Sequence, residues 1–265
     1  MAAAQFEAMQ DGTKIAYRED GGGEASGRCG FFWLGGLKSD MDGAKAEAVA
    51  TLARDTRRPS LRFDYSGHGK SGGLFAEGTI SNWLEQAVHM FTNRAPGRRI
   101  VIGSSMGGWL ALLLLRKLLL EDRRAAARMA GLVLIAPAAD MTTDLMWDIF
   151  PKEVRAEIAA NGLWMRPSLY GDPYAITGKL IEDGHRHLLL RKGQDCPCPV
   201  RILQGSADPE VPASHASKLF EALRGPDITL TLIKGGDHRL SAPAQLSLIR
   251  ATTLRLAEGA DGVSL

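Results

Sequence analysis

A serine lies between two glycines at a point where a strand is expected to give way to a helix. Ser105 is the central residue of a G-x-S-x-G pattern, residues 103–107 (GSSMG). Residues 99–103 form an apolar run typical of a buried strand, and residues 109–120 are apolar on nearly every side of a helix. A serine on such a tight turn presents its hydroxyl above the edge of a sheet. We therefore interpret Ser105 as a nucleophile.

A second glycine-rich stretch, residues 67–73 (GHGKSGG), matches two other patterns. It holds another G-x-S-x-G with Ser71 at its centre, but Ser71 lies several residues beyond its strand and precedes more loop. It also fits the G-x-G-x-x-G of a dinucleotide site, which needs a helix that begins at the glycines and an acidic residue after a second strand. Here the helical pattern begins only near Ile80 and that acidic residue is absent. We interpret this stretch as a turn.

A histidine and an aspartate follow two later strands and complete the groups that a serine nucleophile needs. A serine hydroxyl requires a neighbouring histidine to accept its proton, and His238 follows the apolar run 228–233 on a Gly-Gly loop. An acid is then needed to orient the imidazole and stabilise its charged form. Asp208, after the predicted strand 199–203, is our candidate, and Asp140, after an earlier strand, is its rival.

Acyl transfer through a serine also requires hydrogen-bond donors for the oxyanion of the tetrahedral intermediate. One donor is expected to be the backbone N–H of Met106, which follows the nucleophile. The other is expected from the loop after the predicted strand 30–34. Gly35 and Gly36 let the backbone approach closely there, and the N–H of Leu37 is the candidate.

Composition excludes several classes of protein and site. The chain has 265 residues, 45% of them hydrophobic and 23% charged, as expected for one large globular domain or one domain with an insertion. Its net charge of +2 implies no nucleic-acid partner. The three cysteines form neither a disulfide framework nor a metal motif. We expect no metal and no cofactor.

The N-terminal residues predict a cytoplasmic protein. They show neither the basic nor the apolar region of a secretory signal, and they carry acidic residues that are unusual in a transit peptide. The most apolar stretch, residues 109–120, is shorter than the roughly 20 residues that a membrane span requires. We therefore expect no membrane span.

Short apolar runs alternate with helical patterns along most of the chain. This alternation predicts an α/β fold whose mostly parallel, doubly wound sheet carries helices on both faces. Residues 5–9 and 14–17 flank Asp11-Gly12, a hairpin signal that adds an antiparallel edge near the N-terminus.

Residues 138–195 differ from the rest of the chain. They show no clear strand and hold a large share of the aromatic side chains, including Tyr170. We expect an inserted helical cap there, over a core formed by residues 1–137 and 196–265. Either the apolar side chains of the cap line a substrate pocket or they only pack the cap onto the sheet. The candidate pocket residues are Trp147, Phe150, Trp164 and Met165.

Several segments resemble the α/β-hydrolase superfamily, in which the triad occurs in the order Ser, Asp, His. They are FDYSGHGKSGG at 63–73, GSSMGGWLALLL at 103–114, LQGSADPEVP at 203–212 and GGDHRLS at 235–241. More narrowly, they are similar to the mitochondrial palmitoyl-protein thioesterase family that also cleaves acyl glucuronides, and to its bacterial relatives. LGGLKSDMDGAKA at 34–46 resembles the first loop of that family.

The resemblance implies the α/β-hydrolase fold, with Ser105 as nucleophile, Asp208 as acid and His238 as base. It also implies cofactor-free hydrolysis of an ester or a thioester, carried by a small molecule or an acylated protein. Two alternative interpretations stay open. One is a hydrolase-fold protein that binds a ligand without catalysis, and the other is an acyltransferase that uses the same triad.

Overall fold

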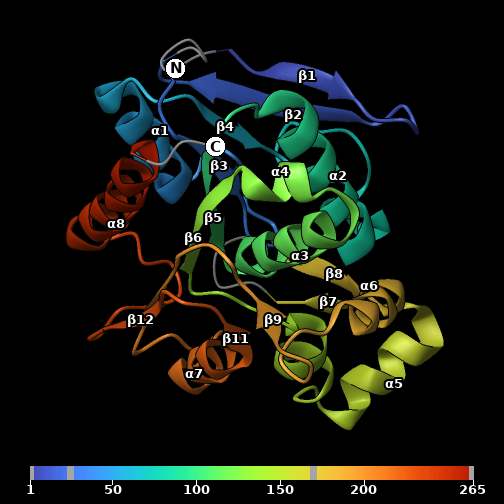
Figure 1. The fold of residues 1–265 in the computed structure, drawn as a ribbon. Coiled ribbons are helices and arrows are strands. Elements are labelled where there is room, and N and C mark those ends of the chain that lie inside the picture. Colours follow the sequence, from blue (N-terminus) through green and yellow to red (C-terminus); the bar gives the residue numbers. More distant parts are fainter. Residues whose placement is uncertain (1–2, 23–26, 168–171, 263–265) are drawn as a thin grey trace.

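A central eight-stranded sheet organises the part of the chain that the computed structural model describes, residues 3–22, 27–167 and 172–262 (Figure 1). The strand order is β1-β2-β4-β3-β5-β6-β10-β12. β1 and β2 form the predicted antiparallel hairpin, β2 is also antiparallel to β4, and the other neighbours are parallel. The strands are β1 (Gln5–Ala8), β2 (Lys14–Asp20), β3 (Gly30–Leu34), β4 (Ser60–Phe63), β5 (Arg99–Ser104), β6 (Met129–Ile135), β10 (Val200–Gly205) and β12 (Ile228–Ile233).

Helices cover both faces of this sheet, and the inner strands β3, β4, β5 and β6 are therefore buried along their whole length. In β3, Phe31 and Trp33 pack in one apolar cluster with the side chains of α1 and α8, whereas Phe32 and Leu34 pack in the other with those of α2, α3 and α7. Alternate residues of a strand point to opposite faces, so the side chains of β3 contribute to the apolar cores on both sides of the sheet. The helices are α1 (Ala44–Thr56), α2 (Ile80–Arg94), α3 (Met106–Glu121), the short α4 (Arg123–Ala127), α7 (Ala213–Ala222) and α8 (Pro243–Asp261).

Helix α3 follows β5 directly and is almost wholly enclosed by protein. Its first ten residues are all buried, in agreement with the all-round apolar pattern of its sequence. Within the described ranges, no helix has both the length and the apolar character that crossing a bilayer demands.

The connection between β6 and β10, residues 136–199, differs in part from the predicted helical cap. It contains helices α5 and α6, but it also contains the antiparallel pair β7 and β8, which the sequence analysis did not predict. Each of these strands has only four residues, LWMR and YAIT, too few to show an alternating pattern. Its elements are η3 (Thr143–Trp147, a π-helical turn), α5 (Lys152–Asn161), β7 (Leu163–Arg166), β8 (Tyr174–Thr177), α6 (Gly178–Gly184), η4 (His185–His187) and β9 (Gln194–Asp195).

This connection packs beside helices α2 and α3 at one end of the molecule (Figure 1). The indole of Trp109 on α3 donates to the carbonyl of His187, and the hydroxyl of Ser81 on α2 donates to Asp183 of α6. Tyr170 lies outside the described residues. The remaining short elements are η2 (Phe75–Glu77) and β11 (Leu223–Arg224), which pairs with β9.

Candidate active site

Ser105 occupies the sharp turn between β5 and α3. Its backbone has φ 54° and ψ −119°, a conformation that is strained for a residue with a side chain. The turn closes only because its neighbours are glycines. A Cβ on Gly103 would lie 2.2 Å from the carbonyl oxygen of Gly107, and a Cβ on Gly107 would lie 2.1 Å from the carbonyl oxygen of Leu34. The G-x-S-x-G pattern is therefore a packing requirement of this turn.

The structure brings together the three side chains that the sequence analysis selected. Nε2 of His238 lies 3.1 Å from Oγ of Ser105, and Nδ1 of His238 lies 2.8 Å from Oδ2 of Asp208. Ser105 follows β5, Asp208 follows β10 and His238 follows β12, so three separate strands deliver them to one edge of the sheet. This chain of hydrogen bonds allows proton transfer between the hydroxyl and the imidazole.

Asp208 is held by the loop on which it lies. Its Oδ1 accepts the backbone N–H groups of Glu210 and Val211, both at 2.9 Å, and its Oδ2 accepts from His238. Burial by itself raises the pKa of this carboxyl. The hydrogen bond and charge of His238 and the two backbone amides outweigh burial and hold the pKa below its usual value. Asp208 is therefore ionised at neutral pH and fixed in one orientation.

Gln204, which the sequence analysis did not select, gives a second side-chain contact to Asp208. This residue of β10 is fully buried, and its Nε2 donates to Oδ2 of Asp208 at 3.1 Å and to the carbonyl of Val211 at 2.8 Å. The only sequence signal was a polar residue near the end of a mostly apolar strand. Gln204 ties the strand to the loop that carries the acid.

Asp140, the rival for the role of the acid, lies elsewhere and has different partners. Its fully buried carboxylate accepts the backbone N–H of Leu189 at 2.7 Å and that of Leu190 at 3.0 Å. Burial raises the pKa of Asp140 more than these two amides lower it. Asp140 therefore joins the beginning of the β6–β10 connection to a segment near its end.

The loop after β3 lies against the nucleophile. A Cβ placed on Gly36 would lie 3.3 Å from Cβ of Ser105 and 3.3 Å from the carbonyl oxygen of Ser104. Leu37 follows in the wall of the cavity beside Ser105, and Met106 is the first residue of α3. Both candidate oxyanion donors thus belong to segments that adjoin Ser105. Donation by their N–H groups stays a prediction.

A cavity of about 750 Å³ opens beside Ser105 and His238. Part of its wall is apolar, formed by three side chains at the start of the β6–β10 connection, Met141, Leu145 and Met146. Another part is charged, and the residues that form it are Lys38, Asp40, Lys45, Arg166, Asp172, Glu210 and Arg239.

The four candidate pocket residues are not among the described residues that line this cavity. Phe150 is buried and packs edge-on against Trp164 at 5.2 Å between ring centroids, Trp147 is half-buried against the same apolar cluster, and Met165 is 48% exposed. Phe150, Trp147 and Trp164 thus pack the connection onto the core, and contact of any of the four with a substrate stays a prediction.

Lys45 is a charged residue of the site that the sequence analysis missed. It lies in the first turn of α1, lines the cavity and donates from Nζ to the backbone carbonyl of Arg239, the residue after His238. Burial lowers its pKa to about 8, against the opposing effect of Asp237. Lys45 therefore links the segment after β3 to the histidine loop.

The second glycine-rich stretch, residues 67–73, has a structural role. Oγ of Ser71 donates to the carbonyl of Asp64 at 2.6 Å and accepts the N–H of Ala16 at 2.8 Å. Burial lowers the pKa of His68 to about 4. Within the described part of the chain, this stretch is followed by loop and η2 before α2 begins at Ile80, and no cluster of three potential metal ligands is found.

Comparisons with known proteins show the family and the fold. Residues 27–247 match the model of the alpha/beta hydrolase family. The mouse protein named palmitoyl-protein thioesterase ABHD10, mitochondrial, is 33% identical over 228 residues, which cover 84% of this chain and 73% of that protein. A putative hydrolase from Agrobacterium vitis S4 superimposes with a TM-score of 0.91 at 40% identity, covering 97% of this chain and all of that one.

A second solved structure is similar along its whole length. It is the alpha/beta hydrolase domain-containing protein 10 from mouse, with a TM-score of 0.85 at 30% identity, covering 97% of this chain and 99% of that one. These matches confirm the resemblance and the fold that the sequence analysis predicted.

Proposed function

The chain belongs to the α/β-hydrolase family, and on that premise we propose that it is a serine hydrolase of carboxylic esters or thioesters. In this proposal Ser105 is the nucleophile, His238 the general base and Asp208 the orienting acid. The observation that carries it is the unbroken chain of hydrogen bonds from Ser105 Oγ through His238 to Asp208, at 3.1 and 2.8 Å.

The first half-reaction forms an acyl-enzyme. Nε2 of His238 accepts the proton of the Ser105 hydroxyl as Oγ attacks the acyl carbonyl carbon, and the carbonyl oxygen gains the negative charge. The N–H groups of Met106 and Leu37 bind this oxyanion. The imidazolium, stabilised by Asp208, then gives its proton to the departing alcohol or thiol as the bond from carbon to oxygen or sulfur breaks.

The second half-reaction releases the acid. Water replaces the alcohol or thiol, His238 accepts one of its protons, and the resulting oxygen nucleophile attacks the acyl carbon. The second tetrahedral intermediate collapses when the bond from carbon to Ser105 Oγ breaks and His238 returns the proton to the serine. The enzyme is regenerated without any change in oxidation state.

The apolar part of the cavity lining supports an apolar acyl group. Met141, Leu145 and Met146 lie on the same cavity wall, and flexible thioether side chains adapt to irregular apolar ligands. The relative named as a palmitoyl-protein thioesterase favours the same class of substrate. We therefore place the acyl chain against these three residues and the leaving group toward the charged part of the wall.

The experiment that tests the proposal combines a fluorophosphonate probe with a panel of nitrophenyl esters and acyl thioesters of increasing chain length. We expect the probe to label the protein, the Ser105→Ala variant to lose both the label and turnover, and longer acyl chains to raise kcat/KM. Ser71→Ala is the matched control, since Ser71 also lies in a G-x-S-x-G, and it should keep the label.

Two results would contradict the proposal. A protein that binds the esters but neither reacts with the probe nor turns them over would be a ligand-binding member of the family. A protein that forms its product only when an alcohol or thiol acceptor is added would be an acyltransferase.

A further inference from the structure

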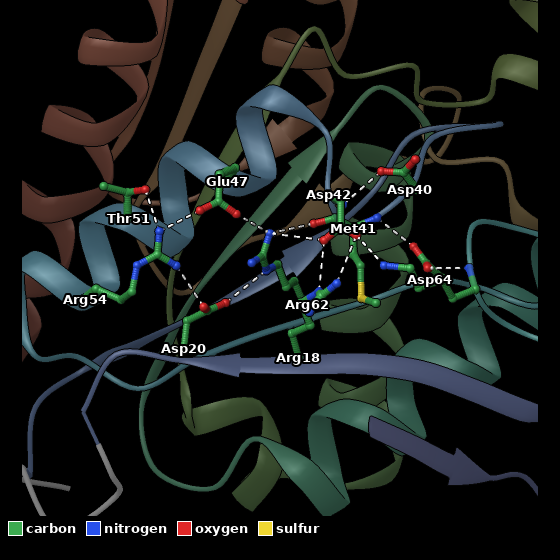
Figure 2. A network of polar contacts seen from close by, with 11 residues as sticks. Arg18, Asp20, Asp40, Met41, Asp42, Glu47, Thr51, Arg54, Arg62 and Asp64 are labelled. Carbon is green, nitrogen blue, oxygen red and sulfur yellow. Dashed lines mark hydrogen bonds and ion pairs between the residues drawn. The ribbon is translucent and has the colours of Figure 1, made fainter. Parts of the chain in front are cut away.

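A network of charged side chains surrounds Met41, four residues after Leu37 in the loop that follows β3 (Figure 2). At its centre is Arg62 on β4, whose side chain is only 1% exposed. Its Nε donates to Oδ2 of Asp20 at 2.9 Å, and its Nη1 lies 2.8 Å from Oε2 of Glu47. Nη1 also donates to the backbone carbonyl of Met41 at 2.9 Å. A buried guanidinium that contacts two carboxylates thus also forms a hydrogen bond to the main chain of the loop.

Asp64 binds the backbone N–H of Met41, the residue whose carbonyl Arg62 binds. Its Oδ1 accepts the backbone N–H of Met41 at 2.6 Å, and its Oδ2 accepts that of Lys70 at 2.8 Å. Arg62 and Asp64 lie two residues apart along the direction of β4, so their side chains point to the same face of the sheet. Both backbone polar groups of Met41 are therefore fixed by side chains from one strand and its end.

The other end of the loop is fixed by the nucleophile itself. Gly36 lies in contact with Ser105, as the position of its hypothetical Cβ shows, and the N–H of Ser39 donates to the carbonyl of Gly36 at 3.1 Å. Leu37 lies between these two attachment points. The segment that carries its N–H is thus attached at Gly36, Ser39 and Met41.

We propose that Arg62 and Asp64 are positioning residues that hold the loop 36–41 so that the Leu37 N–H meets the oxyanion. This proposal rests on the proposed function, because the position of the Leu37 N–H affects catalysis only if an oxyanion forms at Ser105. Such donors work because they are held in place before the reaction, and one of them is worth about 100- to 1000-fold in turnover.

The network supplies its own control residue. Arg54 on α1 donates to the same two carboxylates as Arg62, to Asp20 at 2.9 Å and to Glu47 at 2.6 Å. Its side chain is 39% exposed, and in Figure 2 it lies on the opposite side of Arg62 from Met41. A change at Arg54 weakens the ionic network without touching the loop.

The experiment compares Arg62→Lys, Asp64→Asn and Arg54→Lys. A lysine cannot donate to Asp20 and Met41 in the two directions that a guanidinium serves. An asparagine has a single carbonyl oxygen for the two amides that Asp64 accepts. We expect the first two variants to lower kcat for a nitrophenyl ester by about tenfold or more, with KM within about twofold.

A second readout separates positioning from loss of folded protein. A trifluoromethyl ketone forms a tetrahedral adduct with the serine and places an oxyanion in the same position. Its affinity should fall in proportion to kcat in Arg62→Lys and Asp64→Asn, and both kcat and this affinity should stay unchanged in Arg54→Lys. Asp64→Asn leaves every ion pair of Arg62 intact, so it decides the question if Arg62→Lys does not fold.

The proposal is overturned if Arg62→Lys or Asp64→Asn folds and keeps the kcat of the wild type. It is also overturned if Arg54→Lys loses as much kcat as these two variants. Failure of the proposed function looks different. In that case the wild type shows no turnover, or Ser105→Ala retains it, whatever the Arg62 variants do.

Discussion

Two buried aspartates follow adjacent strands at the same edge of the sheet and have different partners. Asp208 follows β10, Asp140 follows β6, and these strands pair with each other. Each carboxylate accepts two backbone N–H groups. Asp208 takes both of them on Oδ1, so that its Oδ2 accepts from the side chains of His238 and Gln204, whereas Asp140 uses one oxygen for each amide. The difference teaches that an oxygen without a backbone partner, and not the position after a strand, suits an aspartate to orient a histidine.

The largest effect that tests this comparison is expected at Asp208. Asp208→Asn removes the charge that stabilises the imidazolium and allows the wrong tautomer of His238, so turnover should fall by about 10⁴-fold. The measurement is kcat for a nitrophenyl ester, with the melting temperature as evidence that the variant is folded. Near-normal turnover in Asp208→Asn, together with a dead Asp140→Asn, would reverse the two roles.

A smaller effect, on stability alone, is expected at Asp140. Asp140→Asn leaves one buried amide of the 189–190 segment without an acceptor, which should lower the free energy of unfolding by about 1–3 kcal/mol. Urea denaturation measures this loss, and active-site titration gives kcat per folded molecule, which should stay close to that of the wild type. A selective loss of kcat would show that Asp140 contributes to the reaction.

The smallest effect is a difference in pH dependence between the two sites. The pKa of Asp208 lies below its usual 3.8, so its stabilising contribution is present above that pH and is lost as the pH falls through the lowered value. The pKa of Asp140 lies above 3.8, because burial disfavours its charged form. The folded protein therefore loses stability as the pH rises through the raised value.

Urea unfolding at a series of acidic pH values sharpens the comparison. The stability difference between the wild type and Asp208→Asn should shrink as the pH falls, whereas the wild type should lose stability relative to Asp140→Asn as the pH rises. The stability difference between wild type and variant should therefore change with pH in opposite directions for the two variants. A change in the same direction would mean that the two carboxyls have similar environments in the folded protein.

The sheet and the three hydrogen-bonded residues were predictable because their signals are local. The turn at Ser105 needs its glycines. His238 and Asp208 each lie in a loop that follows a predicted strand. Asp208 was chosen as the acid, and Asp140 stayed its rival because both follow a predicted strand. Only the three-dimensional structure shows which of them faces the imidazole.

The β6–β10 connection was less predictable, since its contacts are not encoded by periodicity. β7 and β8 are too short for an alternating pattern, and Phe150 and Trp164 were assigned to a pocket although they pack against each other. Gln204 and Arg62 were missed because a polar residue within a strand gives no sign of its partner. Arg62 binds Asp20 and Met41, which are distant in the sequence, whereas Gln204 binds the loop that directly follows its own strand.

The pair of hydrogen bonds at Asp140 divides the β6–β10 connection into two parts. Because Asp140 binds residues 189 and 190, the two ends of the segment 141–188 meet shortly after the end of β6. The residues that follow then lead the chain to Val200, at the opposite end of the paired strands, where β10 begins. Insertions or deletions within the segment 141–188 should therefore leave the strands that carry Ser105, Asp208 and His238 in place.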